Sequence, residues 1–385
     1  MLEKIKYLTA GESHGLGLLG IVEGIPSHLT LDEDYIKVQL QRRQKGHGRS
    51  NRMKIESDYA QLYCGVRQGM TLGAPIGLII KNKDAKNWTK SMSITDNGYD
   101  KKITLPRPGH ADLAGIMKFG FDDIRNVMER SSARETAMRV AIGAVCRRIL
   151  DELDIHVCSR VIQIYNIIDS SQVDQSLSYD KINQLADKSD VRCLDKKAEL
   201  KMIQEIDNAK KIGDSVGGVI EIHCKGLPYG LGSYSQWEKK LQSKISETIL
   251  SINAFKGIEF GKGFDISKEY GSNIHDEIIF KDNKYERKTN NAGGIEGGMS
   301  NAQPISIKIS MKPIPTLVKP LDSVDINTHK PMKAHKERTD SCAVPAASII
   351  AENLLCIVIA DSILSKFGGD SINQLKIHIK NTAKY

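Results

Sequence analysis

The sequence predicts one large α+β domain that spans residues 1–385. Several segments alternate apolar and polar residues, which indicates strands whose two faces meet different surroundings, as in antiparallel sheets. Residues 344–367 are apolar nearly all round, which is typical of a helix buried on most sides. The chain shows no repeat of roughly 20–50 residues and no stretch with the composition of a linker. We therefore expect a single domain rather than two or three.

In the first half of the chain, apolar runs alternate with helix-capping signals. Thr30 and Glu33 match a capping box, so a helix is expected through Leu40, followed by a basic loop with glycines. Residues 81–108 are polar with few apolar anchors and are expected to form a long loop. The predicted strands in this half are 18–22, 61–66 and 75–80.

In the second half, Ser132 and Glu135 form a second capping box. Residues 169–211 are polar and expected to be helical in part. Residues 344–367 are expected to form a long helix that ends at Gly368. Residues 220–224 and 305–311 alternate as strands. The helix after the capping box carries apolar residues at every fourth position, which should face a core: Ala137, Ala141, Val145, Ile149 and Leu153.

Composition sets limits on the kind of protein. Hydrophobic residues make up 40% and charged residues 26%, as in a globular protein in water. The net charge of +8 suits anionic partners, either metabolites or nucleic acid, and solubility alone would also explain it. Seven cysteines without a CxxC pair indicate a reducing compartment. With no signal-peptide pattern and an apolar run at 354–360 too short to span a bilayer, we expect a cytoplasmic protein that binds no membrane.

Two motifs near the start of the chain match known signatures only by letter. Residues 15–20 fit GxGxxG, but a dinucleotide site needs a strand before the glycines and a helix after them, and this run itself looks like a strand. Residues 11–15 fit GxSxG, but no helix pattern follows Ser13, as a nucleophile elbow would require. We therefore expect neither a Rossmann fold nor a serine hydrolase.

Three other segments are candidates for ligand chemistry. His14 lies in a turn between Gly11 and Gly15, and His110 follows a Pro-Gly turn, so each imidazole could exchange protons with a ligand. The alternative is that either histidine is an ordinary surface or core residue. Residues 130–132, Arg-Ser-Ser, precede a capped helix and could hold a phosphate, or could simply cap the helix.

The basic stretch 42–54 contains several arginines and lysines. It could bind a multiply charged metabolite, nucleic acid or only water, and the lack of aromatic residues in it disfavours single-stranded nucleic acid. The glycine-rich stretch 292–298 could let backbone approach a planar ligand or could form a mobile loop. No spacing of histidines or cysteines predicts a metal site.

Taken together, these strings resemble the chorismate synthase family. The resemblance rests on residues 11–15, 42–49, 107–112, 130–136 and 338–345, which follow one another in the family's order over essentially the whole chain. The segments 251–254 and 312–316 fit as well. One departure is Glu129, where the family often has glycine before the Arg-Ser-Ser string.

The resemblance implies an enzyme of aromatic biosynthesis. Members of the family convert 5-enolpyruvylshikimate-3-phosphate to chorismate by an anti-1,4 elimination of phosphate and the C6 hydrogen, and they require reduced FMN without net redox change. Two sources of electrons stay open, NADPH used by the chain itself or an external flavin reductase. The implied fold is an α/β sandwich with a helical inner layer between two antiparallel four-stranded sheets, assembled as a homotetramer. No nucleic acid or metal is implied.

The resemblance also implies site residues. His110 would protonate the departing phosphate, His14 would control protonation near the reduced flavin, and Asp340 would lie near flavin N5 and help to accept the C6 proton. Ser13 and Ser132 would hydrogen-bond the reacting groups. The implied cofactor-binding residues are Arg43, Arg49, Arg130, Ser131, Ser132, Asn253, Ala254, Gly297, Lys312, Pro313, Ile314, Pro315, Thr316 and Arg338.

Overall fold

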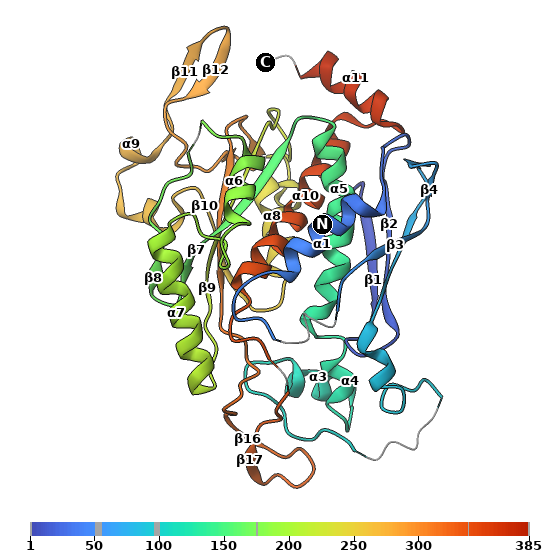
Figure 1. Cartoon of the computed structure of the whole chain (residues 1–385). Helices are drawn as coiled ribbons and strands as arrows, with labels where there is room; N and C mark the ends of the chain where they lie inside the picture. Colours follow the sequence, from blue (N-terminus) through green and yellow to red (C-terminus); the bar gives the residue numbers. More distant parts are fainter. Residues whose placement is uncertain (1, 51–55, 96–100, 175, 338, 384–385) are drawn as a thin grey trace.

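The computed structural model describes residues 2–50, 56–95, 101–174, 176–337 and 339–383. Two antiparallel sheets enclose a layer of helices (Figure 1). The predicted α+β sandwich is confirmed, with one addition, a fifth strand of only two residues on the second sheet. One hydrophobic core includes side chains from both sheets and the inner helices. This shared core supports the prediction of a single domain.

The first sheet has the strand order β1-β2-β6-β3, and all its pairs are antiparallel. Leu18 and Val22 are buried toward the helices while Leu19 and Ile21 between them are exposed, so the apolar run that predicted this strand has apolar side chains on both faces. A small hairpin of β4 and β5 follows β3. The bounds are β1 (Lys6–Gly11), β2 (Gly17–Glu23), β3 (Ala60–Cys64), β4 (Val66–Arg67), β5 (Met70–Thr71) and β6 (Ile76–Lys81).

The second sheet has the order β10-β15-β9-β7-β8. Strand β15 matches the predicted range 305–311, and its isoleucines are buried because they point at the inner helices. Strand β9 contains the predicted range 220–224. The bounds are β7 (His156–Ile164), β8 (Ile167–Ile168), β9 (Gly218–Lys225), β10 (Phe255–Phe260) and β15 (Ile305–Met311).

The inner layer is built around α10 (Val344–Phe367), which packs against the three other inner helices and against β7 and β9. These helices are α1 (Glu33–Gln44), α5 (Thr136–Asp151) and α8 (Leu241–Leu250). By length and composition α10 could cross a membrane, contrary to what the short run 354–360 indicated. Its most apolar window is entirely buried in the fold, so we assign it to the protein core.

The remaining elements surround the sandwich. Helices α3 and α4 lie with the hairpin of β16 and β17 at one end, and the hairpin of β11 and β12 projects from the other end (Figure 1). All seven cysteines are free. The bounds are α3 (Asp112–Phe119), α4 (Arg125–Met128), α6 (Tyr179–Ala186), α7 (Lys196–Ile212), α9 (Gly271–Ile274), α11 (Ile372–Thr382), β11 (Ile278–Lys281), β12 (Lys284–Arg287), β13 (Ile295–Glu296), β14 (Met299–Ser300), β16 (Asp322–Val324) and β17 (Pro331–Lys333), with 3-10 turns η1 (Lys83–Asn87), η2 (Ala133–Glu135), η3 (Trp237–Lys239) and η4 (Gly263–Lys268).

Two predicted capping boxes were wrong in detail. The N-cap of α1 is Asp32, whose carboxylate accepts from the Tyr35 N–H, so the helix begins later than Thr30 indicated. Ser132 does cap the turn η2, but the side chain of Glu135 accepts from Thr9 and Arg139 instead of closing the box. In the first case a neighbouring residue caps the helix, and in the second the contact with the distant Thr9 replaces the local pattern.

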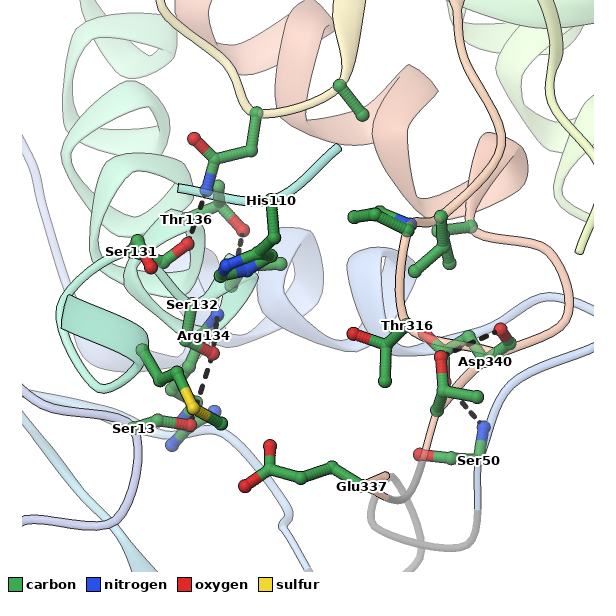
Figure 2. A pocket seen from close by; sticks show the side chains of 18 of the residues that line it. Ser13, Ser50, His110, Ser131, Ser132, Arg134, Thr136, Thr316, Glu337 and Asp340 are labelled. Atoms are coloured by element: carbon green, nitrogen blue, oxygen red, sulfur yellow. Dashed lines mark hydrogen bonds between the residues drawn. The ribbon is translucent and has the colours of Figure 1, made fainter. Parts of the chain in front are cut away.

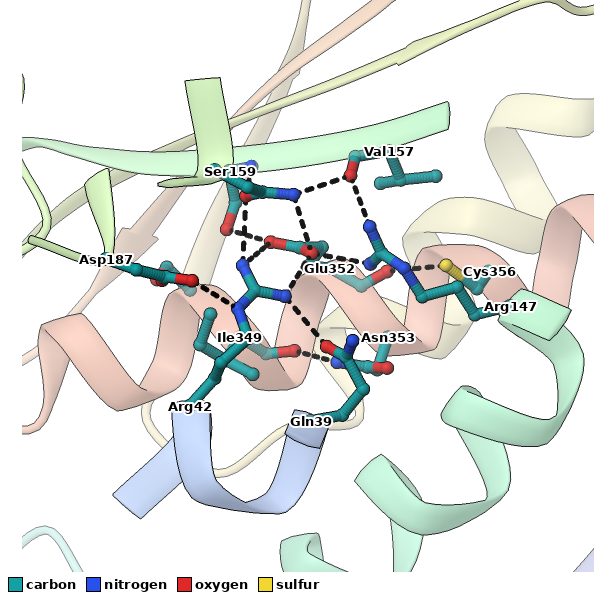
Figure 3. A network of polar contacts seen from close by, with 12 residues as sticks. Gln39, Arg42, Arg147, Val157, Ser159, Asp187, Ile349, Glu352, Asn353 and Cys356 are labelled. Carbon is teal, nitrogen blue, oxygen red and sulfur yellow. Dashed lines mark hydrogen bonds and ion pairs between the residues drawn. The ribbon is translucent and has the colours of Figure 1, made fainter. Parts of the chain in front are cut away.

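A buried polar network crosses the inner layer around Glu352 of α10 (Figure 3). Arg42 donates to both carboxylate oxygens of Glu352 at 2.8 and 3.2 Å, Arg147 donates at 2.5 Å and Ser159 at 2.6 Å. Burial acts to raise the pKa of Glu352, but Arg42, Arg147 and Arg192 together lower it to about 2. A carboxylate that is fully buried therefore stays ionised because arginines surround it.

Candidate active site

A cavity of about 660 Å³ opens where α5 and α10 begin. Its lining comes from the turn after β1, the end of α1, residues 49–50, η1, residues 107 and 109–111, α4, residues 252–254, 311–312 and 314–316, and residues 335–337 and 339–340. Figure 2 shows Ser13 and Ser132 on one side and Thr316 and Asp340 on the other. Seven lysines and arginines against four acidic residues line it, so the cavity suits an anionic ligand.

His14 is held on one wall by Glu129. The His14 N–H donates to Glu129 at 2.8 Å, and its Nδ1 lies 2.9 Å from Oε1 of the same carboxylate. The imidazole also lies against Trp88, with ring centroids 3.9 Å apart. These contacts fix the side chain of His14 in the wall of the cavity.

His110 forms a second pair with a carboxylate. Its Nδ1 lies 2.5 Å from Asp112, which is fully buried, and Arg107 donates to the same carboxylate from Nε at 2.8 Å. Burial acts to raise the pKa of Asp112, but the hydrogen bonds from His110 and Arg107 and their charges lower it well below its usual value. Asp112 therefore stays ionised and orients the imidazole.

The turn that carries His110 is fixed from the second sheet. Gly109 has φ +76°, a conformation that favours glycine, and its carbonyl accepts from Lys312 at 2.6 Å. Thr316 accepts from Arg107 at 2.8 Å. The segments 107–110 and 312–316, which both carry the family resemblance, are therefore in direct contact although some 200 residues apart.

Serines line the wall between the two histidines. The hydroxyl of Ser132 donates to that of Ser13 at 3.1 Å, and the Ser13 N–H donates to the Glu129 carbonyl at 3.0 Å. Asn253 donates to the Ser131 carbonyl at 2.8 Å. The Ser131 hydroxyl is buried and has no hydrogen-bond partner among the described residues, so it can bind a polar ligand atom.

Cations crowd the end of α1. Arg43 is buried and donates to Thr136 at 2.8 Å and to the Ala133 carbonyl at 2.9 Å. Burial lowers the pKa of Arg43 to about 10, with Arg49 and Arg134 lowering it and Asp58 opposing them. A bound anion would relieve this repulsion, since buried like charges destabilise one another.

Asp340 lies on the opposite side of the cavity. Its carboxylate accepts from the Ser50 N–H at 2.6 Å and lies 3.3 Å from Nε of Arg49. Arg49 is thus placed by an acid that the resemblance also assigns to the site. Part of the basic stretch 42–54 lies outside the described residues, but Arg43 and Arg49 both line the cavity.

One wall is apolar and suits a flat ring. Ala346, Ala347 and Ile350 face the cavity from the first turns of α10, and Ile252 and Met311 lie beside them. Apolar walls with a few polar groups are typical of sites for aromatic cofactors. Together with the unpartnered Ser131 hydroxyl and the cations, this wall fits a flavin that carries a phosphate.

The structure brings together most of the predicted site residues and leaves three of the described ones outside the cavity lining. Arg130 is partly exposed and donates to the Thr9 carbonyl at 2.8 Å, outside the cavity lining. Gly297 lies in the turn between β13 and β14, and Pro313 also lies outside the lining. Arg338 is outside the described residues. The predicted residues that line the cavity are Ser13, His14, Arg43, Arg49, His110, Ser131, Ser132, Asn253, Ala254, Lys312, Ile314, Pro315, Thr316 and Asp340.

Asn82 supports the site and was not predicted. Its amide donates to the carbonyls of Glu12, Ser13 and Gly15 at 3.0, 3.2 and 2.9 Å, and its own carbonyl accepts from Nε of Arg134 at 2.9 Å. Its three hydrogen bonds to the turn shape the backbone around His14. An asparagine after a strand has no local signal for such a role, because all its partners are distant in sequence.

Other residues in or beside the cavity wall were present in the quoted motifs without an assigned role. Arg107, Asp112 and Arg134 belong to strings that carried the resemblance, so each could have been assigned from its charge and its neighbours. Trp88 lies in the segment 81–108 that was predicted only as a long loop. Residues 83–87 of that segment form η1, and residues 96–100 lie outside the described residues.

The described residues contain no cluster of three or more side chains that could hold a metal ion. The GxGxxG string at 15–20 runs into strand β2, and no helix follows Ser13. These elements contradict the strand–turn–helix context that either rival motif requires.

Comparison with known proteins gives one consistent family. A family model described as chorismate synthase matches residues 5–364. A protein of Bacillus cereus named chorismate synthase 2 is 49% identical, with 99% of each chain covered. The chorismate synthase of Listeria welshimeri is 50% identical, with 98% of each chain covered. That of Alkaliphilus metalliredigens is 52% identical, with 96% of this chain and 97% of the relative covered.

The fold agrees with a solved structure. A crystal structure titled chorismate synthase superposes with a TM-score of 0.80 at 36% identity and covers 100% of this chain and 98% of the other. Sequence and structure therefore match over the whole length, including every segment that lines the cavity. The chain belongs to the chorismate synthase family of lyases, which use a reduced flavin to eliminate phosphate from 5-enolpyruvylshikimate-3-phosphate and so form chorismate.

Proposed function

We propose that the cavity binds reduced FMN and 5-enolpyruvylshikimate-3-phosphate together, and that its two histidine–carboxylate pairs carry the proton chemistry of the elimination. The observation that carries this proposal is that His14 and His110 both line one cavity with an excess of cations. Two carboxylates and a phosphate on the substrate, with a second phosphate on FMN, need such an excess to offset their mutual repulsion.

The apolar wall and the Ser131 hydroxyl support FMN as the flavin. Ala346, Ala347 and Ile350 offer a surface for the ring, while Ser131, Asn253 and Lys312 offer hydrogen-bond donors to its polar atoms. Bound there, a reduced flavin would supply electron density for an elimination that has no net redox change. Arg130, Gly297, Pro313 and Arg338 stay predictions from the resemblance.

His110 is proposed to protonate the phosphate as it leaves. Asp112 accepts from Nδ1, and Nε2, which lies 3.3 Å from Nη2 of Arg107, is the ring nitrogen proposed to give the proton that the phosphate takes. Ser13 and Ser132 are proposed to hydrogen-bond the reacting groups, and their mutual contact at 3.1 Å keeps the two hydroxyls together. Asp340 is proposed to help accept the C6 proton, with Arg49 and Ser50 holding its carboxylate.

The source of electrons has two alternatives. The chain could take them from NADPH, or an external flavin reductase could deliver reduced FMN. The GxGxxG string is a strand, so it offers no dinucleotide site of the usual kind. This observation favours the external reductase.

A homotetramer in the cytoplasm is also proposed. The outer face of the first sheet is apolar: Leu8 is 72% exposed, Leu19 53% and Ile21 54%, and Leu8 pairs with Ile21 across β1 and β2. Neighbouring exposed apolar side chains of this kind mark surfaces that other chains cover. Seven free cysteines agree with a reducing compartment.

The test of this function is an anaerobic assay. Purified protein is given substrate and FMN, with either dithionite or NADPH as the only reductant, and chorismate and phosphate are measured. We expect turnover with dithionite and none without FMN. Turnover with NADPH as the only reductant would show that the chain reduces FMN itself and needs no external reductase. Phosphate release without flavin would overturn the proposed cofactor.

Arg49→Ala is expected to weaken binding of FMN and substrate by about 10–100-fold, because the anionic ligands lose a cation of the cavity and Asp340 loses the ion-pair partner 3.3 Å away. Arg49→Lys should restore only part of the affinity, since lysine lacks the planar fork. Calorimetric titration measures both. Arg67→Ala, an exposed arginine outside the cavity lining, is the control. Unchanged affinity in Arg49→Ala would mean that this part of the basic stretch only meets solvent.

A further inference from the structure

Glu129, which stands directly before the Arg-Ser-Ser string, touches a histidine of the cavity. Its carboxylate accepts from the backbone N–H of His14 at 2.8 Å, and its two oxygens lie 2.9 and 3.1 Å from Nδ1 of the His14 imidazole. Its carbonyl accepts from the Ser13 N–H at 3.0 Å. Glu129 therefore binds both the backbone and the side chain of the Ser13–His14 turn.

This carboxylate is buried and ionised. The side chain of Glu129 is 5% exposed and that of His14 is 11% exposed. Burial acts to raise the pKa of Glu129, but the hydrogen bond and charge of His14 and the charge of Arg125 bring it below its usual value. Arg125 donates to Oε1 at 3.0 Å, so the carboxylate has a permanent counter-ion besides the imidazole.

A second side chain, that of Trp88, also holds the imidazole of His14 in place. Trp88 lies against His14, its Nε1 donates to Asp84 at 3.2 Å, and the Arg125 guanidinium lies 5.0 Å from the Trp88 ring centroid. Glu129 thus contacts His14 directly, while Arg125 and Asp84 contact the Trp88 ring that lies against it. Of these, Glu129 is the acceptor that contacts a ring nitrogen of His14.

We propose that Glu129 is a positioning residue for His14, whose carboxylate keeps the ring proton on Nδ1 so that Nε2 is the atom that exchanges a proton with the ligand. An ionised carboxylate can only accept a hydrogen bond, so the nitrogen that it contacts must carry the proton. The tautomer of a histidine is set in this way by the partner of its other nitrogen. This inference rests on the proposed role of His14 and deepens it.

The experiment reads the tautomer directly. The protein without ligands is labelled with ¹⁵N-histidine, and the ring resonances are recorded at a pH where the imidazoles are neutral, with His14 assigned by its absence in His14→Ala. We expect Nδ1–H in the wild type and mainly Nε2–H in Glu129→Ala. Glu129→Gln keeps the volume but offers one oxygen to three donors, so a mixture is expected there. The matched control is Glu135→Ala, a buried glutamate on η2 whose carboxylate binds Thr9 and Arg139.

Turnover gives the second readout. Glu129→Ala should lower kcat by about 10–100-fold, with a smaller change in KM. Removing a group that orients a metal-binding histidine has an effect of this size in other enzymes. Glu129→Asp should recover part of kcat. Mainly Nε2–H in the wild type, or the same tautomer in wild type, Glu129→Ala and Glu129→Gln, would overturn the inference. If instead the tautomer shifts as expected while His14→Ala keeps full turnover, the inference about Glu129 stands and the proposed role of His14 fails.

Discussion

His110→Ala is expected to lower kcat by about 10²–10⁴-fold, the contribution of a general acid that is removed from its site. The alanine leaves the departing phosphate without a proton donor, while Arg107 and Asp112 keep their own ion pair at 2.8 Å, so the fold around the turn should survive. Steady-state assay with dithionite-reduced FMN measures kcat, and circular dichroism measures folding.

The control is His156→Ala. His156 also lies beside carboxylates, at 2.8 Å from Asp154 and 3.2 Å from Asp180, but it is on β7 outside the cavity. Its removal should leave kcat unchanged. If the two alanine variants have the same kcat as the wild type, His110 has no part in proton transfer and another group must protonate the phosphate.

The second large effect concerns stability. Glu352→Gln should lower the free energy of unfolding by about 3–5 kcal/mol, because removing one partner of a buried ion pair leaves charges without compensation. Here Arg42 and Arg147 would lose the carboxylate that they contact at 2.8 and 2.5 Å. Urea unfolding followed by fluorescence measures the difference. Asp265→Asn, which breaks an exposed ion pair with Lys268, is the control and should change stability little.

The difference between wild type and Glu352→Gln should depend on pH. Because the folded protein lowers the pKa of Glu352 to about 2, the ionised carboxylate stabilises the fold fully above its unfolded pKa of about 4.3. That contribution is lost as the pH falls toward 2, where wild type should approach the variant. A difference that stays constant from pH 7 to pH 2.5 would show that charge at residue 352 is not what holds the network.

Much of the fold could be predicted from periodicity. Strand β15 and helix α10 have the predicted bounds because a buried strand face and a helix buried all round leave clear apolar patterns. The capping boxes were less reliable, since Glu135 binds Thr9 rather than its own helix start. A short strand such as β8 has too few residues to show any alternation.

The candidate site was predictable where its residues lie in distinctive strings. His14, His110 and Ser132 were found in that way, and all three line the cavity. Asn82 and Asp58 could not be found, because their contacts join segments some 15 to 76 residues apart, and a single sequence shows no pairing over such distances. Glu129 was noticed only as a departure from the family; its contact with His14 became visible once the two segments were placed side by side.

The position of α10 has a consequence for synthesis of the chain in the cell. This helix is the centre of the inner layer, yet it follows the other inner helices and both sheets in the chain and so leaves the ribosome after them. Until it emerges, α1, α5, α8, β7 and β9 lack the helix that they pack against, and the apolar side chains that it covers stay exposed to other chains. Truncated products that end before residue 344 should therefore aggregate or recruit chaperones.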